Sequence, residues 1–256
     1  MDVADALTRL DQITRRLRVE CPWDREQDER TIVPHTVEEA YELADAAHRR
    51  DDHKLLDELG DVLFQVYFLA LLLEERGAGS IEQVAENIIT KLIRRHPHVF
   101  GETEAATAQD VLRNWDAIKR TEPGREGIFP DVPANLPGPL YARKIQRRAA
   151  STGFDFDQTP YHTVTDELIE LQNAASPDER FHELGDLLFA AVNVARKLRV
   201  DPELALRAAA DRFRSRVIGA GDLAASDGRN WNDLDPDQQL GYYVRAHRSK
   251  GDPHQR

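Results

Sequence analysis

The chain has almost no cysteine and no long apolar stretch, and each absence removes a class of protein. The one cysteine, Cys21, excludes an intramolecular disulfide and indicates a reducing compartment. The longest apolar run, residues 66–73, is far too short to span a bilayer. The N-terminus carries Asp2 and Asp5 where a secretory signal peptide would be basic. These features predict a cytoplasmic protein that does not enter membranes.

Positive charge is also scarce. Lys and Arg number 34 against 46 Asp and Glu, and the net charge of −12 disfavours a nucleic-acid polymer or an anionic membrane as partner. An acidic protein can still bind a phosphate ester when a divalent cation and a few local Lys or Arg residues mediate the contact. Three common catalytic signatures are missing, namely a Gly-rich phosphate loop followed by Lys, a nucleophile elbow and a Cys/His zinc spacing.

What the sequence does contain is helical periodicity along most of its length, with no segment of strand period. We expect an all-α fold. Thr36, three residues before Glu39, has the spacing of a capping box and predicts a helix start there, after a loop over residues 20–36. Gly219 predicts the end of a late helix. The expected helices are 3–18, 37–50, 52–76, 81–95, 107–120, 140–151, 161–175, 182–198, 202–218 and 236–247.

The region 121–139 differs in composition from the rest of the chain. It holds five prolines and three glycines, which is typical of a linker. We therefore predict a first domain over residues 1–120, a linker over 121–139 and a second domain with a polar tail over 140–256.

The two predicted domains share a motif. Residues 57–64 read DELGDVLF and residues 182–189 read HELGDLLF. Glu183 lies 125 residues after Glu58, and Glu167 lies 128 residues after Glu39, so a second acidic pair repeats in nearly the same register. The sequence thus indicates one long duplication of a helical unit.

In the first copy two acidic pairs have the spacing i, i+3, Glu39 with Glu42 and Glu58 with Asp61. Each pair lies on one helical face, and two such helices packed together would bring four carboxylates into one place. Four like charges repel unless a cation is present, and oxygen-only ligands suit Mg²⁺ or Mn²⁺. Each pair alone could be a solvated helix face. Its repetition favours a metal site.

A di-iron bundle is a weaker interpretation. It requires two Glu-x-x-His motifs, and the chain has Glu179 to His182 alone. Basic and aromatic residues follow the acidic pairs instead, with Lys91 and Arg95 spaced i, i+4 and Trp115 and Lys119 spaced likewise. They could bind a polyphosphate and stack on a base, although a basic helix end and a core tryptophan are equally ordinary explanations.

These residues together resemble the MazG family of nucleoside triphosphate pyrophosphohydrolases. The segments that carry the resemblance are CPWDREQ at 21–27, TVEEAYELADA at 36–46, LLDELGDVLFQVYF at 55–68, KLIRRHPHVFGE at 91–102, VLRNWDAIK at 111–119, YARKIQRRAASTGFDF at 141–156 and HELGDLLFAAVNVARKL at 182–198.

The resemblance implies tandem MazG-like helical-bundle domains whose subunits form a homodimer. It implies a Mg²⁺ site made by Glu39, Glu42, Glu58 and Asp61, which are also the candidate catalytic residues. It places Lys91, Arg95, Trp115 and Lys119 in contact with the nucleotide. The second-copy metal set becomes Glu167, Glu170, Glu183 and Asp186, with Arg212 and Arg216 at the Lys and Arg positions.

The implied reaction is Mg²⁺-dependent hydrolysis of a nucleoside triphosphate to the monophosphate and pyrophosphate, in cleaning of the nucleotide pool. The first copy is favoured as catalytic because the second has no Trp-x-x-x-Lys motif, although in some two-domain relatives only the second domain is active. Two alternatives stay open: a narrow pyrimidine deoxynucleotide pyrophosphatase, and a non-catalytic helical regulator that binds nucleotides.

Overall fold

The computed structural model describes residues 2–122, 127, 129, 132–133 and 135–249, and all regular secondary structure in them is helical. The predicted all-α class is confirmed. The chain divides into two compact units, residues 1–125 (the N-terminal unit) and 126–256 (the C-terminal unit). Much of the predicted linker at 121–139 lies outside the described residues. None of the described helices is long and apolar enough to cross a membrane.

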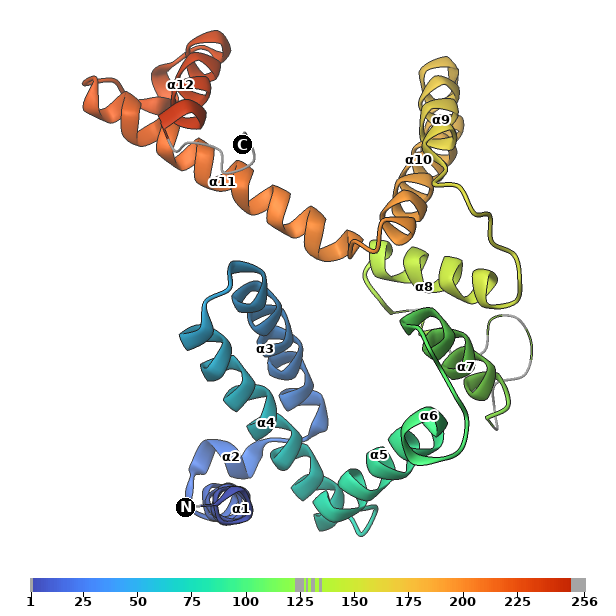
Figure 1. The fold of residues 1–256 in the computed structure, drawn as a ribbon. Coiled ribbons are helices and arrows are strands. Elements are labelled where there is room, and N and C mark those ends of the chain that lie inside the picture. Colours follow the sequence, from blue (N-terminus) through green and yellow to red (C-terminus); the bar gives the residue numbers. More distant parts are fainter. Residues whose placement is uncertain (1, 123–126, 128, 130–131, 134, 250–256) are drawn as a thin grey trace. The chain divides into compact units, whose positions relative to one another are not determined.

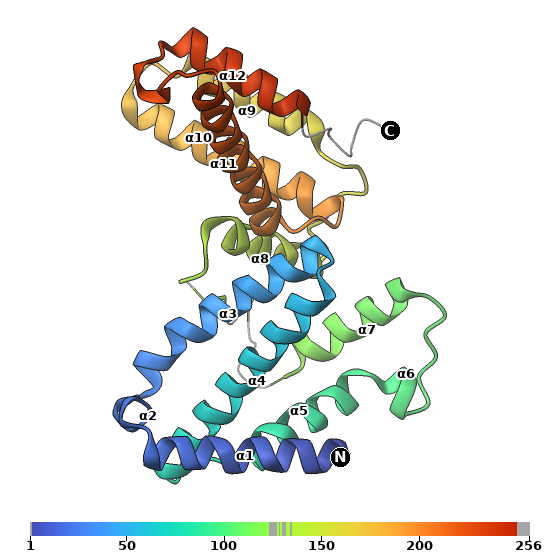
Figure 2. The same ribbon diagram turned by 90° about the vertical axis from the view of Figure 1, so that its left-hand side faces the viewer.

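The N-terminal unit is built around a hairpin of two long helices. The α3 and α4 helices pack side by side along much of their length, α1 packs against α4, and α5 contacts both α4 and α7 (Figures 1 and 2). The helices of this unit are α1 (Val3–Glu20), α2 (Pro22–Glu26), α3 (Glu29–Arg49), α4 (Asp52–Glu75), α5 (Ile81–Arg95), α6 (Pro97–Phe100) and α7 (Ala108–Arg120).

Local side chains define the α3–α4 turn and the start of α5. Arg50 adopts a left-handed conformation (φ 56°) that ends α3, and Asp51 caps α4 by accepting from the backbone N–H of Lys54 at 3.0 Å. Ser80 caps α5 through the backbone N–H of Gln83. Because only Arg50 and Asp51 separate the two helices, the acidic pairs on α3 and α4 are held close together.

The predicted start of α3 at Thr36 is wrong. The helix begins at Glu29, where Asp28 and Thr31 form the capping box, and it continues through Pro34. Proline inside a helix loses one hydrogen bond and is unfavourable by about 3 kcal/mol. Ile32 compensates, because it is 2% exposed and packs with Phe68 and Leu72 of α4 in the core of this unit. Most of the predicted loop at 20–36 is therefore helical.

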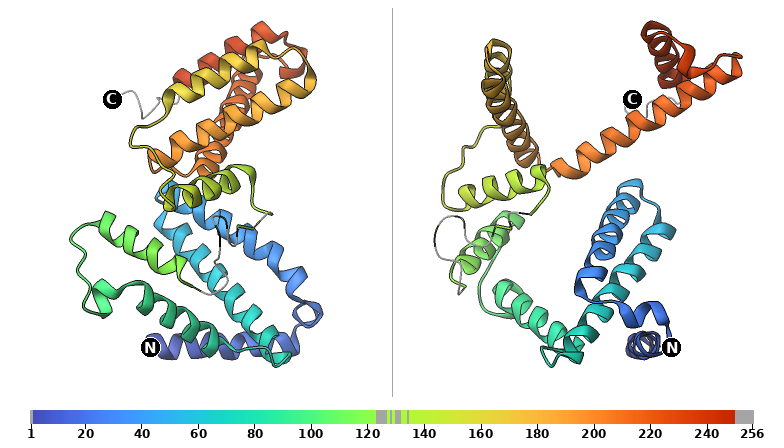
Figure 3. Two further views of the ribbon diagram at one scale, coloured as in Figure 1. Left: turned by 90° about the vertical axis from the view of Figure 1, so that its right-hand side faces the viewer. Right: turned by 180° about the vertical axis from the view of Figure 1, so that it is seen from behind.

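The C-terminal unit repeats the central hairpin. The α9 and α10 helices pack side by side, α8 packs across α10, and α11 carries α12 near its far end (Figures 1 and 3). Its elements are α8 (Gly138–Ser151), α9 (Tyr161–Asn173), α10 (Pro177–Lys197), α11 (Pro202–Ser226), the 3-10 turn η1 (Trp231–Asp233) and α12 (Pro236–Ser249).

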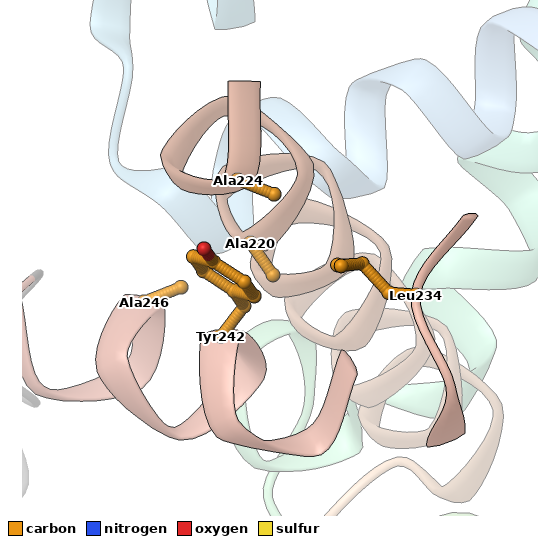
Figure 4. Close-up of a cluster of buried hydrophobic side chains, with 5 residues drawn as sticks. All are labelled: Ala220, Ala224, Leu234, Tyr242 and Ala246. Carbon is orange, nitrogen blue, oxygen red and sulfur yellow. The ribbon is translucent and has the colours of Figure 1, made fainter. Parts of the chain in front are cut away.

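The predicted end of α11 at Gly219 is also wrong, since the helix continues to Ser226. A small residue is useful here for packing, because a Cβ on Gly219 would already touch the Ala246 methyl at 3.7 Å. Figure 4 shows Tyr242 of α12 lying against Ala220 in a cluster of buried side chains. This packing holds α11 helical past the glycine.

Candidate metal and nucleotide site

In the N-terminal unit the α3–α4 hairpin brings three predicted ligands together. Glu39 comes from α3, and Glu58 and Asp61 come from α4, with one carboxylate oxygen of each lying within 4.8 Å of the others. The fourth predicted ligand, Glu42, is exposed and lies outside this trio. We call Glu39, Glu58 and Asp61 the first acidic cluster.

Glu58 is the most buried member of the cluster. Its side chain is 1% exposed, and neither carboxylate oxygen has a hydrogen bond of regular geometry among the described residues. The charged group that touches Glu58 is the ammonium of Lys54, one turn earlier on α4. Lys54 Nζ also lies 3.6 Å from Glu42 Oε2. A buried carboxylate is costly without a cation, and Lys54 neutralises part of the charge of Glu58.

The carboxylates of the cluster differ in proton affinity. Contact with Lys54 holds the pKa of Glu58 below its ordinary value. Burial, followed by the negative charge of Asp61, raises the pKa of Glu39. Repulsion among close carboxylates is what a bound cation would remove.

The donor set fits a hard divalent cation. All its donors are carboxylate oxygens, and they converge within 4.8 Å of one another. An ion bound to Glu58 would compete with the ammonium of Lys54. Mg²⁺ and Mn²⁺ favour oxygen ligands and keep coordination positions for water or phosphate.

The C-terminal unit forms a second acidic cluster at the corresponding place. Oxygens of Glu167, Glu170 and Glu183 lie within 4.8 Å of one another, across the α9–α10 hairpin. Asp186 lies outside this trio, although its charge, after burial and Glu170, contributes to raising the pKa of Glu167. Three of the four predicted ligands in each unit therefore converge.

The two clusters differ in their nearest basic group. The α10 position equivalent to Lys54 is Glu179, by the offset of 125 that relates Glu58 to Glu183. Glu179 completes a capping box with Ser176, and it accepts from the backbone N–H of Ala175 at 2.7 Å. Lys54 thus has no counterpart at this position.

Three of the four predicted nucleotide-binding residues, Arg95, Trp115 and Lys119, gather around one indole ring. Arg95 lies 5.5 Å and Lys119 4.5 Å from the centre of the Trp115 ring. Glu122 accepts from Arg95 Nε at 2.8 Å and from Arg95 Nη2 at 2.6 Å. These contacts, chiefly with Arg95, lower the pKa of Glu122 to about 2.

The predicted basic residues do not all reach the clusters. Lys91 is exposed, and no hydrogen bond or ion pair described in the structure joins Lys91 or Arg95 to the first acidic cluster. Arg212 and Arg216 of α11 likewise form no ion pair with another residue of the described ranges.

Sequence reasoning missed two residues of the site. Lys54 could have been found, because it precedes Glu58 by four residues and such pairs meet on one helical face. Glu122 could not have been found, because it follows α7 inside the segment predicted as a linker. No periodicity in that segment indicates which side chain contacts Arg95 of α5.

The chain is similar in sequence to a known domain family and to several known proteins. The profile of the MazG nucleotide pyrophosphohydrolase domain matches residues 27–100, which contain the first acidic cluster. A nucleoside triphosphate pyrophosphohydrolase of Escherichia coli K12 is 38% identical over 242 residues, 90% of this chain and 92% of that protein. The nucleoside triphosphate pyrophosphohydrolase/pyrophosphatase MazG of Thermotoga maritima is 39% identical over 230 residues, which cover 88% of this chain and 89% of that protein. Mycobacterium tuberculosis has a relative 32% identical over 178 residues, 69% of this chain and 52% of that protein.

Proposed function

Because this chain belongs to the MazG nucleotide pyrophosphohydrolase family, we propose that it hydrolyses nucleoside triphosphates to the monophosphate and pyrophosphate. The relatives named for this activity cover most of the chain. The observation that carries the proposal is the first acidic cluster, in which buried Glu58 meets Glu39 and Asp61.

The metal ligands in this proposal are Glu39, Glu58 and Asp61, with Glu42 completing the predicted set, and the ion is Mg²⁺ or Mn²⁺. When bound, such an ion neutralises phosphate charge and withdraws electron density from a phosphate oxygen. The second acidic cluster, with Asp186 beside it, would hold an ion in the same way.

The chain's own groups would bind the substrate and move the proton. Glu42 is exposed beside the cluster, with Lys54 Nζ 3.6 Å from its Oε2, and it would orient a water molecule and accept its proton. Lys91 and Lys119 would bind the polyphosphate, and Trp115 would stack on the base. Arg95 would support Trp115 rather than the phosphates, since Glu122 already holds its guanidinium and balances its charge.

We propose further that the protein is a homodimer. The hairpin helices leave apolar side chains open beside the acidic residues, with Leu56 74%, Leu59 49% and Leu63 38% exposed on α4. Leu184 and Leu188 of α10 are 46% and 59% exposed at the equivalent positions. Apolar patches of this kind mark interaction surfaces, and a second copy would cover them.

The role in this proposal is cleaning of the nucleotide pool of the cytoplasm. The acidic composition argues against a nucleic-acid polymer as partner. The boundaries 1–120 and 140–256 for two MazG-like domains stay part of this proposal.

The decisive experiment measures pyrophosphate release from canonical and modified nucleoside triphosphates, with Mg²⁺ and Mn²⁺ compared. The variants Glu42→Gln and Asp61→Asn test the N-terminal unit, and Glu170→Gln and Asp186→Asn test the C-terminal unit. Asp45→Asn is the matched control, because Asp45 is on α3 but pairs with Arg49 and is not one of the converging carboxylates.

We expect at least one pair to abolish metal-dependent release while the control keeps it. Full activity in all four variants would sink the proposed metal site. Nucleotide binding without turnover in the unaltered protein would favour the non-catalytic regulator, and turnover of a single pyrimidine deoxynucleotide would favour the narrow pyrophosphatase.

A further inference from the structure

We propose that the C-terminal unit binds the heteroaromatic base of a nucleotide in a cavity between α8, the loop at 152–160 and α10. This inference rests on the proposed function, because it takes the neighbouring second acidic cluster as the phosphate end of the same site. The cavity was assigned no role by the sequence.

The cavity has the size and lining of a small-molecule site. Its volume is about 440 Å³, within the range of ligand pockets. Four aromatic rings line it, from Phe129, Phe154, Phe156 and Phe189. The rings of Phe154 and Phe156 lie 5.7 Å apart, and these residues are 70% and 71% exposed. Exposed aromatic rings at a cavity are suited to stacking on a base.

A buried amide supplies a hydrogen-bond acceptor. Gln146 of α8 is 7% exposed, and its Nε2 donates to the backbone carbonyl of Phe189 at 2.8 Å. A carbonyl accepts only from the nitrogen, so this bond determines which way the amide faces. The remaining oxygen, Gln146 Oε1, is buried with no hydrogen-bond partner in the described chain, although Gln146 lines the cavity. A buried unpaired oxygen is unfavourable until a ligand donates to it.

Asn193 of α10 supplies the complementary donor. Its Oδ1 accepts from Arg196 Nε at 2.9 Å, so its Nδ2 is the group left for a ligand. No hydrogen bond from Nδ2 is formed within the described residues. An amide acceptor and an amide donor at one cavity match the edge of a nucleobase, where donors and acceptors lie side by side.

The loop that carries the two phenylalanines is held in place by charge. Asp155 binds Arg196 Nη2 at 2.7 Å and Lys197 Nζ at 2.8 Å. These contacts, chiefly with Arg196, lower the pKa of Asp155 to about 2. Lys197 also donates to the backbone carbonyl of Phe156. The stacking rings are therefore attached to the same helix that carries Asn193.

The cavity and the second acidic cluster share one face of α10. Glu183, Asp186 and Asn193 are spaced i, i+3 and i+10, which places them along one stripe of the helix. At 1.5 Å per residue, Asp186 and Asn193 are separated by about 10 Å along the axis. One nucleotide can therefore place its base in the cavity and its phosphates at the acidic cluster.

The equivalent place in the N-terminal unit is lined by apolar side chains. The α4 positions that correspond to Asn193, Arg196 and Lys197 are Phe68, Leu71 and Leu72. Phe68 and Leu72 are buried in a packed cluster with Ile32. The same helix face is thus core in one unit and a polar, aromatic cavity in the other.

The test uses the full chain and a nucleoside without phosphates, 2-aminopurine riboside, whose fluorescence is quenched when its base stacks. Binding is measured with EDTA present. The variants are Gln146→Leu, which removes the acceptor at similar volume, and the double change Phe154→Ala and Phe156→Ala. Phe181→Ala is the matched control, because Phe181 is 77% exposed on α10 and does not line the cavity.

We expect saturable quenching in the unaltered protein and the control, and affinity lower by about tenfold or more in both test variants, on the scale of one lost hydrogen bond or stacked base. In turnover assays Gln146→Leu should raise KM with kcat unchanged. Equal nucleoside affinity in all proteins would overturn the inference, as would a change confined to the oligomeric state in gel filtration.

Nucleoside binding measured with EDTA present does not depend on the proposed hydrolysis. Nucleoside binding that persists in Asp186→Asn but is lost in Gln146→Leu supports the cavity even if no triphosphate is hydrolysed. Hydrolysis with no nucleoside binding leaves the acidic clusters in place and removes the cavity from the site.

Discussion

The two units carry the same acidic motif and balance its charge differently. In the N-terminal unit Lys54 contacts Glu58 and lies beside Glu42, so part of the negative charge is neutralised internally. In the C-terminal unit the equivalent residue is Glu179, which caps α10 instead. A repeated motif therefore does not imply a repeated demand for metal. We expect the second acidic cluster to depend more strongly on a bound cation.

The same contrast extends along the helices beyond the motif. Phe68 and Leu72 fill the interior of the N-terminal unit, whereas Asn193 and Lys197 border a cavity in the C-terminal unit. One unit uses this helix face for stability, and the other keeps it open. Substitutions at matched positions should therefore have unequal effects.

The largest expected effect is on stability at this matched pair. Phe68 is fully buried, so Phe68→Ala should lower the free energy of unfolding of the N-terminal unit by about 3–5 kcal/mol. Asn193→Ala should lower that of the C-terminal unit by about 1 kcal/mol or less. Hydrogen exchange of α4 and α10 peptides measures both. Equal losses would remove the distinction between packed core and open cavity.

Acid sensitivity provides the next contrast. The pKa of Glu122 falls from 4.5 to about 2 on folding, so its contact with Arg95 contributes stability that is present above pH 4.5 and lost as pH falls through about 2. We expect this contact to contribute about 2 kcal/mol to the free energy of unfolding of the N-terminal unit. Asp155, at 36% side-chain exposure, should contribute about 1 kcal/mol to the C-terminal unit.

Acid unfolding curves of Glu122→Gln and Asp155→Asn check this order. Each variant should lose the pH dependence of its own unit below pH 4.5 and leave the other unit unchanged. A steeper acid transition in Glu122→Gln than in the unaltered protein would contradict the assignment.

Removing the internal cation should strengthen metal binding at the first acidic cluster. In Lys54→Met the carboxylates of Glu58 and Glu42 lose their ammonium partner, and Mn²⁺ affinity should rise by about tenfold. Titration by electron paramagnetic resonance measures free Mn²⁺. Glu183→Gln and Asp186→Asn in the same chain silence the second cluster, so that the change is assigned to one unit. Unchanged affinity would show that Lys54 does not compete with the ion.

The smallest expected effect comes from the reverse exchange. Glu179→Lys places an ammonium one turn before Glu183 and should weaken Mn²⁺ binding at the second cluster by about threefold, the scale of an exposed ion pair. Glu179→Gln is the matched control, since glutamine at this position still caps the helix without adding positive charge. Similar weakening in both would point to the lost cap rather than to charge.

The sequence predicted the helical class, most helix positions and the residues that form the two acidic trios. Periodicity and i, i+3 spacing are local properties, so helix faces can be read from the chain. The start of α3 could not be predicted in this way. Pro34 and Thr36 are local signals for a loop and a cap, whereas the burial of Ile32 against Phe68, which keeps this segment helical, is a tertiary contact. Gly219 led to a wrong prediction for the same reason. It is a local signal for a helix end, but α12 packs against α11 at this point and the helix continues.

The repeated acidic residues of the site could be predicted from the sequence, but not which of them meet in space. Acidic residues repeat visibly, but which of four carboxylates converge depends on the angle at which two helices pack, and Glu42 and Asp186 fall outside the trios. Glu122 and Asp155 reach basic partners 27 and 41 residues away in sequence. No short-range pattern reports contacts of that kind.

The stripe on α10 has a consequence for ligand length. A helix is stiff, so the distance of about 10 Å between Asp186 and Asn193 acts as a ruler. If a base and a phosphate chain occupy its two ends, loss of pyrophosphate removes most of the negative charge held at the acidic cluster, and the product keeps its base and one phosphate. Product release would then follow from the reaction itself, without a moving lid.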